Sequence, residues 1–127
     1  MIAALSSWHE QHDRAARALA SVDALPAHVI VEAYAVLTRL PSGLAVAASE
    51  AATVLSRRFE GSPLRLADAA RGAVLETLAA AGVRGGATYD GLVALEAKAH
   101  GRTLLTLDER AQETYGRLGA AFTVIAA

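Results

Sequence analysis

The sequence predicts a single α/β domain in which helices cover both faces of a parallel sheet. Helical segments alternate along the chain with short apolar segments of strand character, an order typical of parallel sheets. No tract rich in Pro, Ser or Gly and no tandem repeat divides the 127 residues. This length suits one domain with a hydrophobic core of its own, so we expect residues 1–127 to form one domain.

Three helices are expected in the first half of the chain. The first covers residues 9–21, where apolar residues recur at helical spacing among charged ones. The second covers residues 28–40 and ends before Pro41, which cannot continue a helix. The third covers residues 46–59 and carries two arginines at its C-terminal end, where they complement the helix dipole.

The second half contains the expected strands. Residues 63–66 form a short apolar segment with strand character, and a helix over residues 68–81 follows and ends at Gly82. Gly85 and Gly86 indicate a turn, after which Thr88 is a suitable helix cap and Gly101 a helix stop. The remaining elements are a helix over residues 88–100, a strand over 103–107, a helix over 109–118 and a strand over 121–125.

Charge and cysteine content exclude several classes of protein. The formal net charge is −1 at pH 7, so any site for a polyanion must be local. The chain has no cysteine, which excludes disulfides, thiolate zinc sites and cysteine nucleophiles. No apolar run is long enough to cross a bilayer and no signal-peptide pattern is found, so we expect a cytoplasmic protein without membrane contact.

Three carboxylates are the main candidates for a functional site: Glu32, Asp90 and Asp108. Asp108 directly follows the predicted strand over residues 103–107, and ligands of parallel sheets bind beyond the carboxyl ends of the strands. Clustered carboxylates repel one another unless a cation or a proton lies between them. Hard oxygen ligands of this kind favour Mg²⁺ or Mn²⁺.

Each carboxylate also has a structural alternative. Asp108 could be the N-cap of the helix that follows it, which is the commoner role of an isolated aspartate after a strand. Asp90 could complement the dipole of its helix, and Glu32 could lie on a narrow solvent-facing stripe of an apolar helix. The histidine pair His9 and His12 is expected to be solvated or capping rather than metal-binding.

Three segments resemble conserved blocks of the VapC-type toxins of the PIN family. Residues 31–41, VEAYAVLTRLP, resemble the block that carries an active-site glutamate, here Glu32. Residues 88–97, TYDGLVALEA, and residues 104–108, LLTLD, resemble the next two blocks. All three occur in the family's order and spacing, and the resemblance extends over nearly the whole chain. It implies a PIN-like parallel sheet flanked by helices.

The resemblance also implies a function, that of a metal-dependent endoribonuclease in a toxin–antitoxin pair. Glu32, Asp90 and Asp108 would hold Mg²⁺ or Mn²⁺ directly or through water, and Thr106 would orient a ligand or a bound water. Arg39 is the expected contact to an RNA phosphate. A small antitoxin protein would wrap the toxin and obstruct its cleft, and members of the family commonly pair into homodimers.

One feature of the family is not found. Its members open with a strand that carries an aspartate followed by Thr or Ser, and no such segment precedes Ile2. We therefore expect a form that lacks the N-terminal strand and has little or no activity on RNA. The second hypothesis is accordingly a non-catalytic PIN-like module that binds an antitoxin or RNA but holds no metal.

Overall fold

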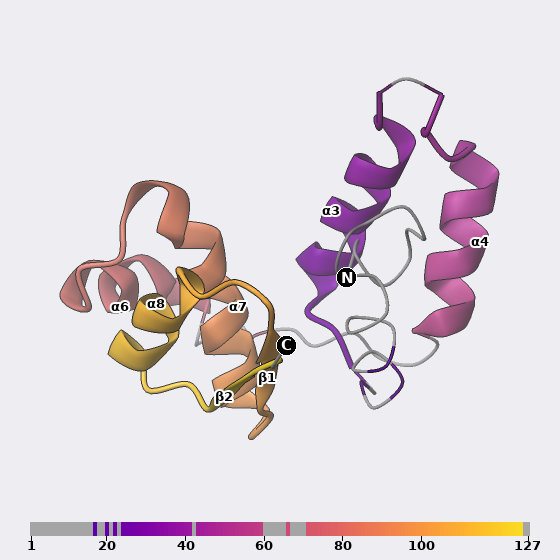
Figure 1. Cartoon of the computed structure of the whole chain (residues 1–127). Coiled ribbons are helices and arrows are strands. Elements are labelled where there is room, and N and C mark those ends of the chain that lie inside the picture. Colours follow the sequence, from indigo (N-terminus) through magenta and orange to yellow (C-terminus); the bar gives the residue numbers. More distant parts are fainter. Residues whose placement is uncertain are drawn as a thin grey trace. The chain divides into compact units, whose positions relative to one another are not determined.

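Figure 1 shows the computed structural model of the chain. It describes residues 17, 20, 22, 24–41, 43–59, 66 and 71–125. The chain divides into two compact units, residues 1–63 and 64–127, and each is described by itself. The single domain expected for residues 1–127 stays a prediction. Among the described residues, no helix is long and apolar enough to cross a membrane.

Two helices stand out among the described residues of the first unit, α3 (Ala27–Thr38) and α4 (Ala48–Arg58), and they confirm the predicted helices over residues 28–40 and 46–59. The backbone N–H of Val46 donates to the carbonyl of Leu37 at 2.9 Å and so ties the connecting segment to the end of α3. The buried core between the helices consists of Ala33, Leu37, Ala51 and Leu55. The helix expected over residues 9–21 lies almost entirely outside the described residues.

The second unit is built from helices and a parallel two-stranded sheet. The elements with described bounds are α6 (Val74–Ala80), the 3₁₀ helix η1 (Gly85–Ala87), α7 (Thr88–Ala99), β1 (Leu104–Thr106), α8 (Ala111–Arg117) and β2 (Phe122–Val124). Strands β1 and β2 are parallel, with Leu104 opposite Phe122. The predicted α/β class is therefore confirmed, and the two described strands run parallel, as expected of the sheet. Of the strand expected over residues 63–66, only the buried Leu66 is described, and it has no strand assignment.

One core holds the second unit together. Its buried members are Leu78, Val83, Ala94, Ala111, Tyr115, Leu118 and Ala120. Outside this core, the Lys98 ammonium of α7 donates to the carbonyl of Leu118 at 3.0 Å and so fixes the end of α8 against α7.

Two predicted details near α7 are wrong. Thr88 is not a cap: Ala87 occupies the N-cap position without a side-chain hydrogen bond, because η1 runs directly into α7 and Thr88 already has helical dihedral angles. Gly85 and Gly86 accordingly belong to a 3₁₀ helix rather than a simple turn. Helix α6 begins at Val74 after a turn at Ala73, and Arg71 and Gly72 before that turn are also helical, so the helix predicted over residues 68–81 is interrupted at Ala73.

Gly82 ends α6, as predicted, with a φ of 71° that only glycine adopts without strain. Its N–H donates to the carbonyl of Ala79 at 3.0 Å, and the N–H of Val83 donates to the carbonyl of Leu78 at 2.9 Å. This pair of bonds satisfies the last carbonyls of the helix. Gly101, also predicted as a stop, ends α7 in the same way with a φ of 63°.

Gly91 of α7 is expected to be a packing residue. A Cβ atom at this position would lie 2.5 Å from Cδ2 of Leu78 and 3.1 Å from Cγ1 of Val83, and both side chains are buried in the core. Gly91→Ala should therefore lower the free energy of unfolding by about 1–2 kcal/mol, although alanine is the better helix former. Chemical denaturation measures the change. Gly116→Ala in α8, where nothing lies within 4 Å of the added Cβ, is the control and should be neutral or stabilising. Equal effects of the two substitutions would contradict this account of the packing.

Candidate functional site

The end of β1 presents an aspartate in a hydrogen-bonded loop. The N–H of Asp108 donates to the hydroxyl of the buried Thr106 at 3.0 Å. One carboxylate oxygen of Asp108, Oδ1, accepts the N–H of Arg110 at 2.9 Å and lies 3.6 Å from Nε of the same arginine. Short side chains that accept a backbone N–H two residues further on favour such a turn over continued strand. The carboxylate is thereby held in one orientation at the carboxyl end of the strand.

The alternative of Asp108 as the helix N-cap is not what the structure shows. Helix α8 begins at Ala111 rather than residue 109, and Arg110 occupies the N-cap position. The Asp108 side chain accepts the N–H of Arg110, the residue directly before the first residue of α8. The same side chain remains about half exposed. Its second carboxylate oxygen takes no part in the contacts to Arg110, and the side chain is accessible to solvent.

Tyr115 of α8 brings the two aspartates and Thr106 into one neighbourhood. Its ring packs against Phe122 of β2, with the ring centroids 5.7 Å apart. Burial raises the pKa of the Tyr115 phenol, and the negative charges of Asp90 and Asp108 raise it further, whereas a hydrogen bond with the Thr106 side chain acts in the opposite direction. The phenol is thus neutral at physiological pH and keeps a proton that it can donate.

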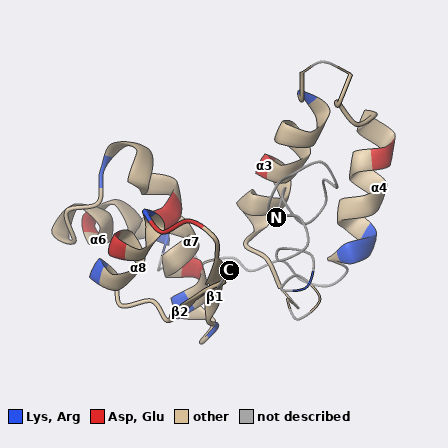
Figure 2. Ribbon diagram, viewed as in Figure 1, with Lys and Arg blue, Asp and Glu red and all other residues tan. Residues whose placement is uncertain are grey.

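Asp90 lies in the first turn of α7, next to the packed Gly91. Figure 2 marks acidic residues both on α7 and in the segment that joins β1 to α8. The charges of Asp90 and Asp108 both raise the pKa of the Tyr115 phenol, so each of the two predicted residues is near enough to Tyr115 to influence its titration. That they share a cation stays a prediction.

Glu32 and Arg39 belong to the first unit. Glu32 is exposed on α3, and its neighbour Val31 is 67% exposed, so the accessible face of the helix is not limited to a narrow polar stripe. Arg39 is exposed at the C-cap of α3. The two units are described separately, so the convergence of Glu32 with the aspartates stays a prediction. No group of three or more His, Asp or Glu side chains suited to a metal is found among the described residues, which do not include His9 and His12.

The second unit carries the type of donor atom that a divalent cation prefers. Asp90 and Asp108 offer hard carboxylate oxygens, and the buried Thr106 and Tyr115 supply hydroxyl groups beside them. Such hydroxyl groups are suited to orient carboxylate ligands or bound water. The chemistry of the donor set agrees with the Mg²⁺ or Mn²⁺ expected from the sequence.

Sequence reasoning missed Tyr115 and Arg110. Tyr115 follows Ala111 by four residues and precedes Leu118 by three, so its spacing indicates a core position and nothing more. Its proximity to Asp90, 25 positions earlier in the chain, arises from the packing of α7 against α8. Arg110 has no sequence signal either, because its contact depends on the turn after Asp108.

Thr106→Val is expected to destabilise the second unit. Valine keeps the shape but removes the hydroxyl that accepts the Asp108 N–H and contacts the Tyr115 phenol. The valine variant leaves the Asp108 N–H without its hydrogen-bond acceptor, which should lower the free energy of unfolding by about 1–3 kcal/mol. Thermal or urea denaturation measures it, with Thr106→Ser, which keeps the hydroxyl, as the control. A valine variant as stable as wild type would show that these hydrogen bonds contribute nothing.

Comparison with known proteins identifies the family. Residues 1–117 match the PIN domain family, so the chain belongs to it. The chain is 43% identical over 118 residues to Ribonuclease VapC40 of Mycobacterium tuberculosis, an alignment that covers 93% of this chain and 88% of that protein. It is also 43% identical over 103 residues to Ribonuclease VapC27 of the same organism, covering 81% and 74%. No solved structure matches it. The family predicted from the sequence is confirmed.

Proposed function

We propose that the chain is a metal-dependent endoribonuclease, the toxin of a toxin–antitoxin pair, which hydrolyses phosphodiester bonds of RNA in the cytoplasm. The observation that carries the proposal is the 43% identity to proteins named ribonucleases over most of the chain, and the effect of the Asp90 and Asp108 charges on the Tyr115 phenol supports it. A pair of carboxylates beyond the end of a parallel strand is suited to hold a cation beside a phosphate.

The proposed cation ligands are Asp90, Asp108 and Glu32, with Mg²⁺ or Mn²⁺ as the ion. The bound ion would lower the pKa of a water molecule and neutralise charge on the phosphate. Arg110 holds one oxygen of Asp108 through its backbone N–H, and Thr106 fixes the backbone of the same aspartate. The ligand is thus oriented before the ion arrives, which lowers the cost of binding.

Tyr115 has a separate role in the proposal. Its phenol is kept neutral by burial and by the two aspartates, so it donates a hydrogen bond to an aspartate oxygen or to a bound water. Water attacks phosphorus, the bond from phosphorus to one ester oxygen breaks, and no covalent bond to the protein forms. Arg39, exposed at the end of α3, is proposed as a contact to the phosphate.

An antitoxin protein and a second copy of the chain are the proposed protein partners. VapC-type toxins of the PIN family, which the chain resembles, act in such pairs. An antitoxin segment that covers Asp90 and Asp108 would block both the cation and the RNA. Addition of the cognate antitoxin should therefore abolish cleavage by the purified chain.

A cleavage assay tests the proposed function. The purified full chain is incubated with 5′-labelled single-stranded RNA and either Mg²⁺, Mn²⁺ or EDTA, and the products are resolved on a gel. We expect slow internal cuts with a divalent ion, in line with the weak activity expected from the sequence, and none with EDTA. RNA binding without cleavage under every condition would favour the non-catalytic module, and cleavage in EDTA would contradict the role of the carboxylates.

A further inference from the structure

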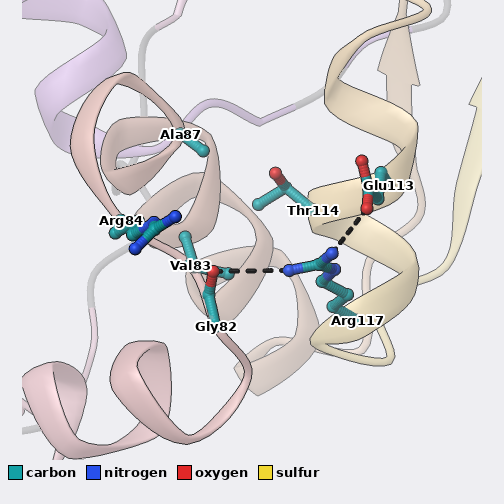
Figure 3. Close-up of a pocket in the computed structure, with 7 residues that line it drawn as sticks. All are labelled: Gly82, Val83, Arg84, Ala87, Glu113, Thr114 and Arg117. Carbon is teal, nitrogen blue, oxygen red and sulfur yellow. Dashed lines mark hydrogen bonds and ion pairs between the residues drawn. The ribbon is translucent and has the colours of Figure 1, made fainter.

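A second site in the same unit lies in a hollow between the end of α6, the start of α7 and the exposed face of α8. Its volume is about 110 Å³, enough for one phosphate-sized group. Figure 3 shows Arg84 from the loop after α6 and Arg117 from α8 on the two sides of Val83. A larger adjoining hollow, of about 590 Å³, is lined by the same two arginines and opens toward solvent.

Arg117 is fixed in the hollow by two contacts. Its Nη2 donates to Oε1 of Glu113 at 2.6 Å, and its Nη1 donates to the carbonyl of Gly82 at 3.3 Å. A Cβ atom on Gly82 would lie only 3.1 Å from the same Nη1, so the glycine leaves the space that the guanidinium uses. These contacts leave further N–H donors of Arg117 for a ligand, because a guanidinium carries five.

Two polar groups in the hollow have no partner among the described residues. Arg84 is exposed on an extended backbone and makes no ion pair with a described residue. Thr114 lines the hollow and is only 7% exposed, yet its hydroxyl makes no hydrogen bond to any other residue that the structure describes. The hydroxyl oxygen is not among the buried atoms that lack a partner, so it faces the solvent of the hollow and can donate to a ligand atom there.

The charge balance indicates which ligand fits. Arg84 and Arg117 contribute two positive charges and Glu113 one negative charge, which leaves the hollow with a net charge of about +1. A phosphodiester carries a single negative charge and would make the hollow neutral. Arginine forks and a hydroxyl are also the donors that commonly contact phosphate oxygens of nucleic acids.

We propose that the hollow between Arg84, Thr114 and Arg117 binds a backbone phosphate of single-stranded RNA, away from the phosphate that is cut. Ala87 lines the hollow and lies three residues before Asp90, and Thr114 lies directly before Tyr115. The hollow therefore adjoins along the chain both the first turn of α7, which carries Asp90, and the residue of α8 whose phenol is affected by both aspartates. The inference rests on the proposed function, because it makes the hollow a part of the RNA-binding surface.

Binding of RNA without metal tests the proposal separately from cleavage. The full chain in EDTA is titrated into a fluorescent single-stranded RNA at several salt concentrations, and anisotropy gives the Kd. Arg84→Gln should weaken binding about tenfold and reduce the slope of log Kd against log salt by about 0.7, the value for one lost phosphate contact on a single strand. Arg57→Gln on α4, an exposed arginine with the same change of charge, is the control and should have little effect.

A change of opposite sign gives a second test. Glu113→Gln removes the negative charge beside Arg117 and should tighten RNA binding several-fold, whereas Glu76→Gln on α6, which is also exposed, should not. Wild-type affinity and salt slope in Arg84→Gln would overturn the proposal. A second result would also overturn it: Arg84→Gln weakens the binding of inorganic phosphate but leaves the affinity for RNA at the wild-type value. The hollow would then be a site for free phosphate rather than for RNA. Loss of cleavage alone, with these binding results intact, would contradict only the catalytic proposal.

Discussion

Asp108→Asn is expected to reduce divalent-ion-dependent RNA cleavage at least 100-fold while the fold is retained. The amide keeps the shape of the carboxylate and still offers an oxygen to the Arg110 N–H, so the turn after β1 should survive. What is lost is the charge that holds the cation, and a change of one metal ligand costs more than the 10- to 100-fold typical of residues that only orient ligands. The rate of cleavage of labelled RNA measures the loss.

Stability gives an independent measurement on the same variant. Without metal, Asp90 and Asp108 both act on one buried phenol, so removal of one charge should leave the thermal midpoint unchanged or raise it. Glu109→Gln removes a charge from the adjacent exposed residue and is the matched control, for which we expect the wild-type rate. A folded Asp108→Asn protein that cleaves RNA at the wild-type rate would rule out the role assigned to this aspartate.

Glu32→Gln is expected to have the second largest effect, a loss of cleavage of at least tenfold with little change in stability. Glu32 is exposed on α3, and exposed substitutions away from special contacts seldom change stability by more than about 0.5 kcal/mol. A large kinetic effect without an effect on folding would therefore indicate a role in the site. The control is Glu50→Gln, an exposed glutamate in the first turn of α4. Equal rates for the two variants and wild type would remove Glu32 from the proposed site.

The parts of the fold that the sequence predicts well are those with strong local signals. Helix α3 begins directly after Pro26, since proline is tolerated at a helix start, where its missing N–H is not needed. The helix ends at Thr38, before Pro41, because a proline inside the helix would remove a backbone hydrogen bond. Helix α7 ends at Gly101, where the positive φ favours glycine. Strands β1 and β2 coincide with apolar segments rich in strand-forming residues, and their parallel pairing follows from the helix between them.

The features that the sequence does not predict depend on contacts between distant residues. The start of α7 was expected at a Thr88 cap, but the 3₁₀ helix before it provides a continuous entry and makes the cap unnecessary. The neighbourhood of Tyr115 and the hollow beside Arg117 arise where α8 packs near residues more than 20 positions away. The family resemblance indicates Asp90 and Asp108 as candidate site residues, but it gives no indication of the Thr106 and Tyr115 hydroxyl groups in the same unit.

Titration of the metal-free chain with Mn²⁺ tests the central claim most directly, because it measures the proposed cation site without reference to RNA. Calorimetry or the electron paramagnetic resonance signal of free Mn²⁺ reports the number of ions bound and their affinity. The account predicts saturable binding to the wild-type chain and to Glu109→Gln, and binding at least tenfold weaker in Asp90→Asn and Asp108→Asn. Saturable Mn²⁺ binding with the same affinity in all four proteins, or no binding to the wild-type chain, would contradict it.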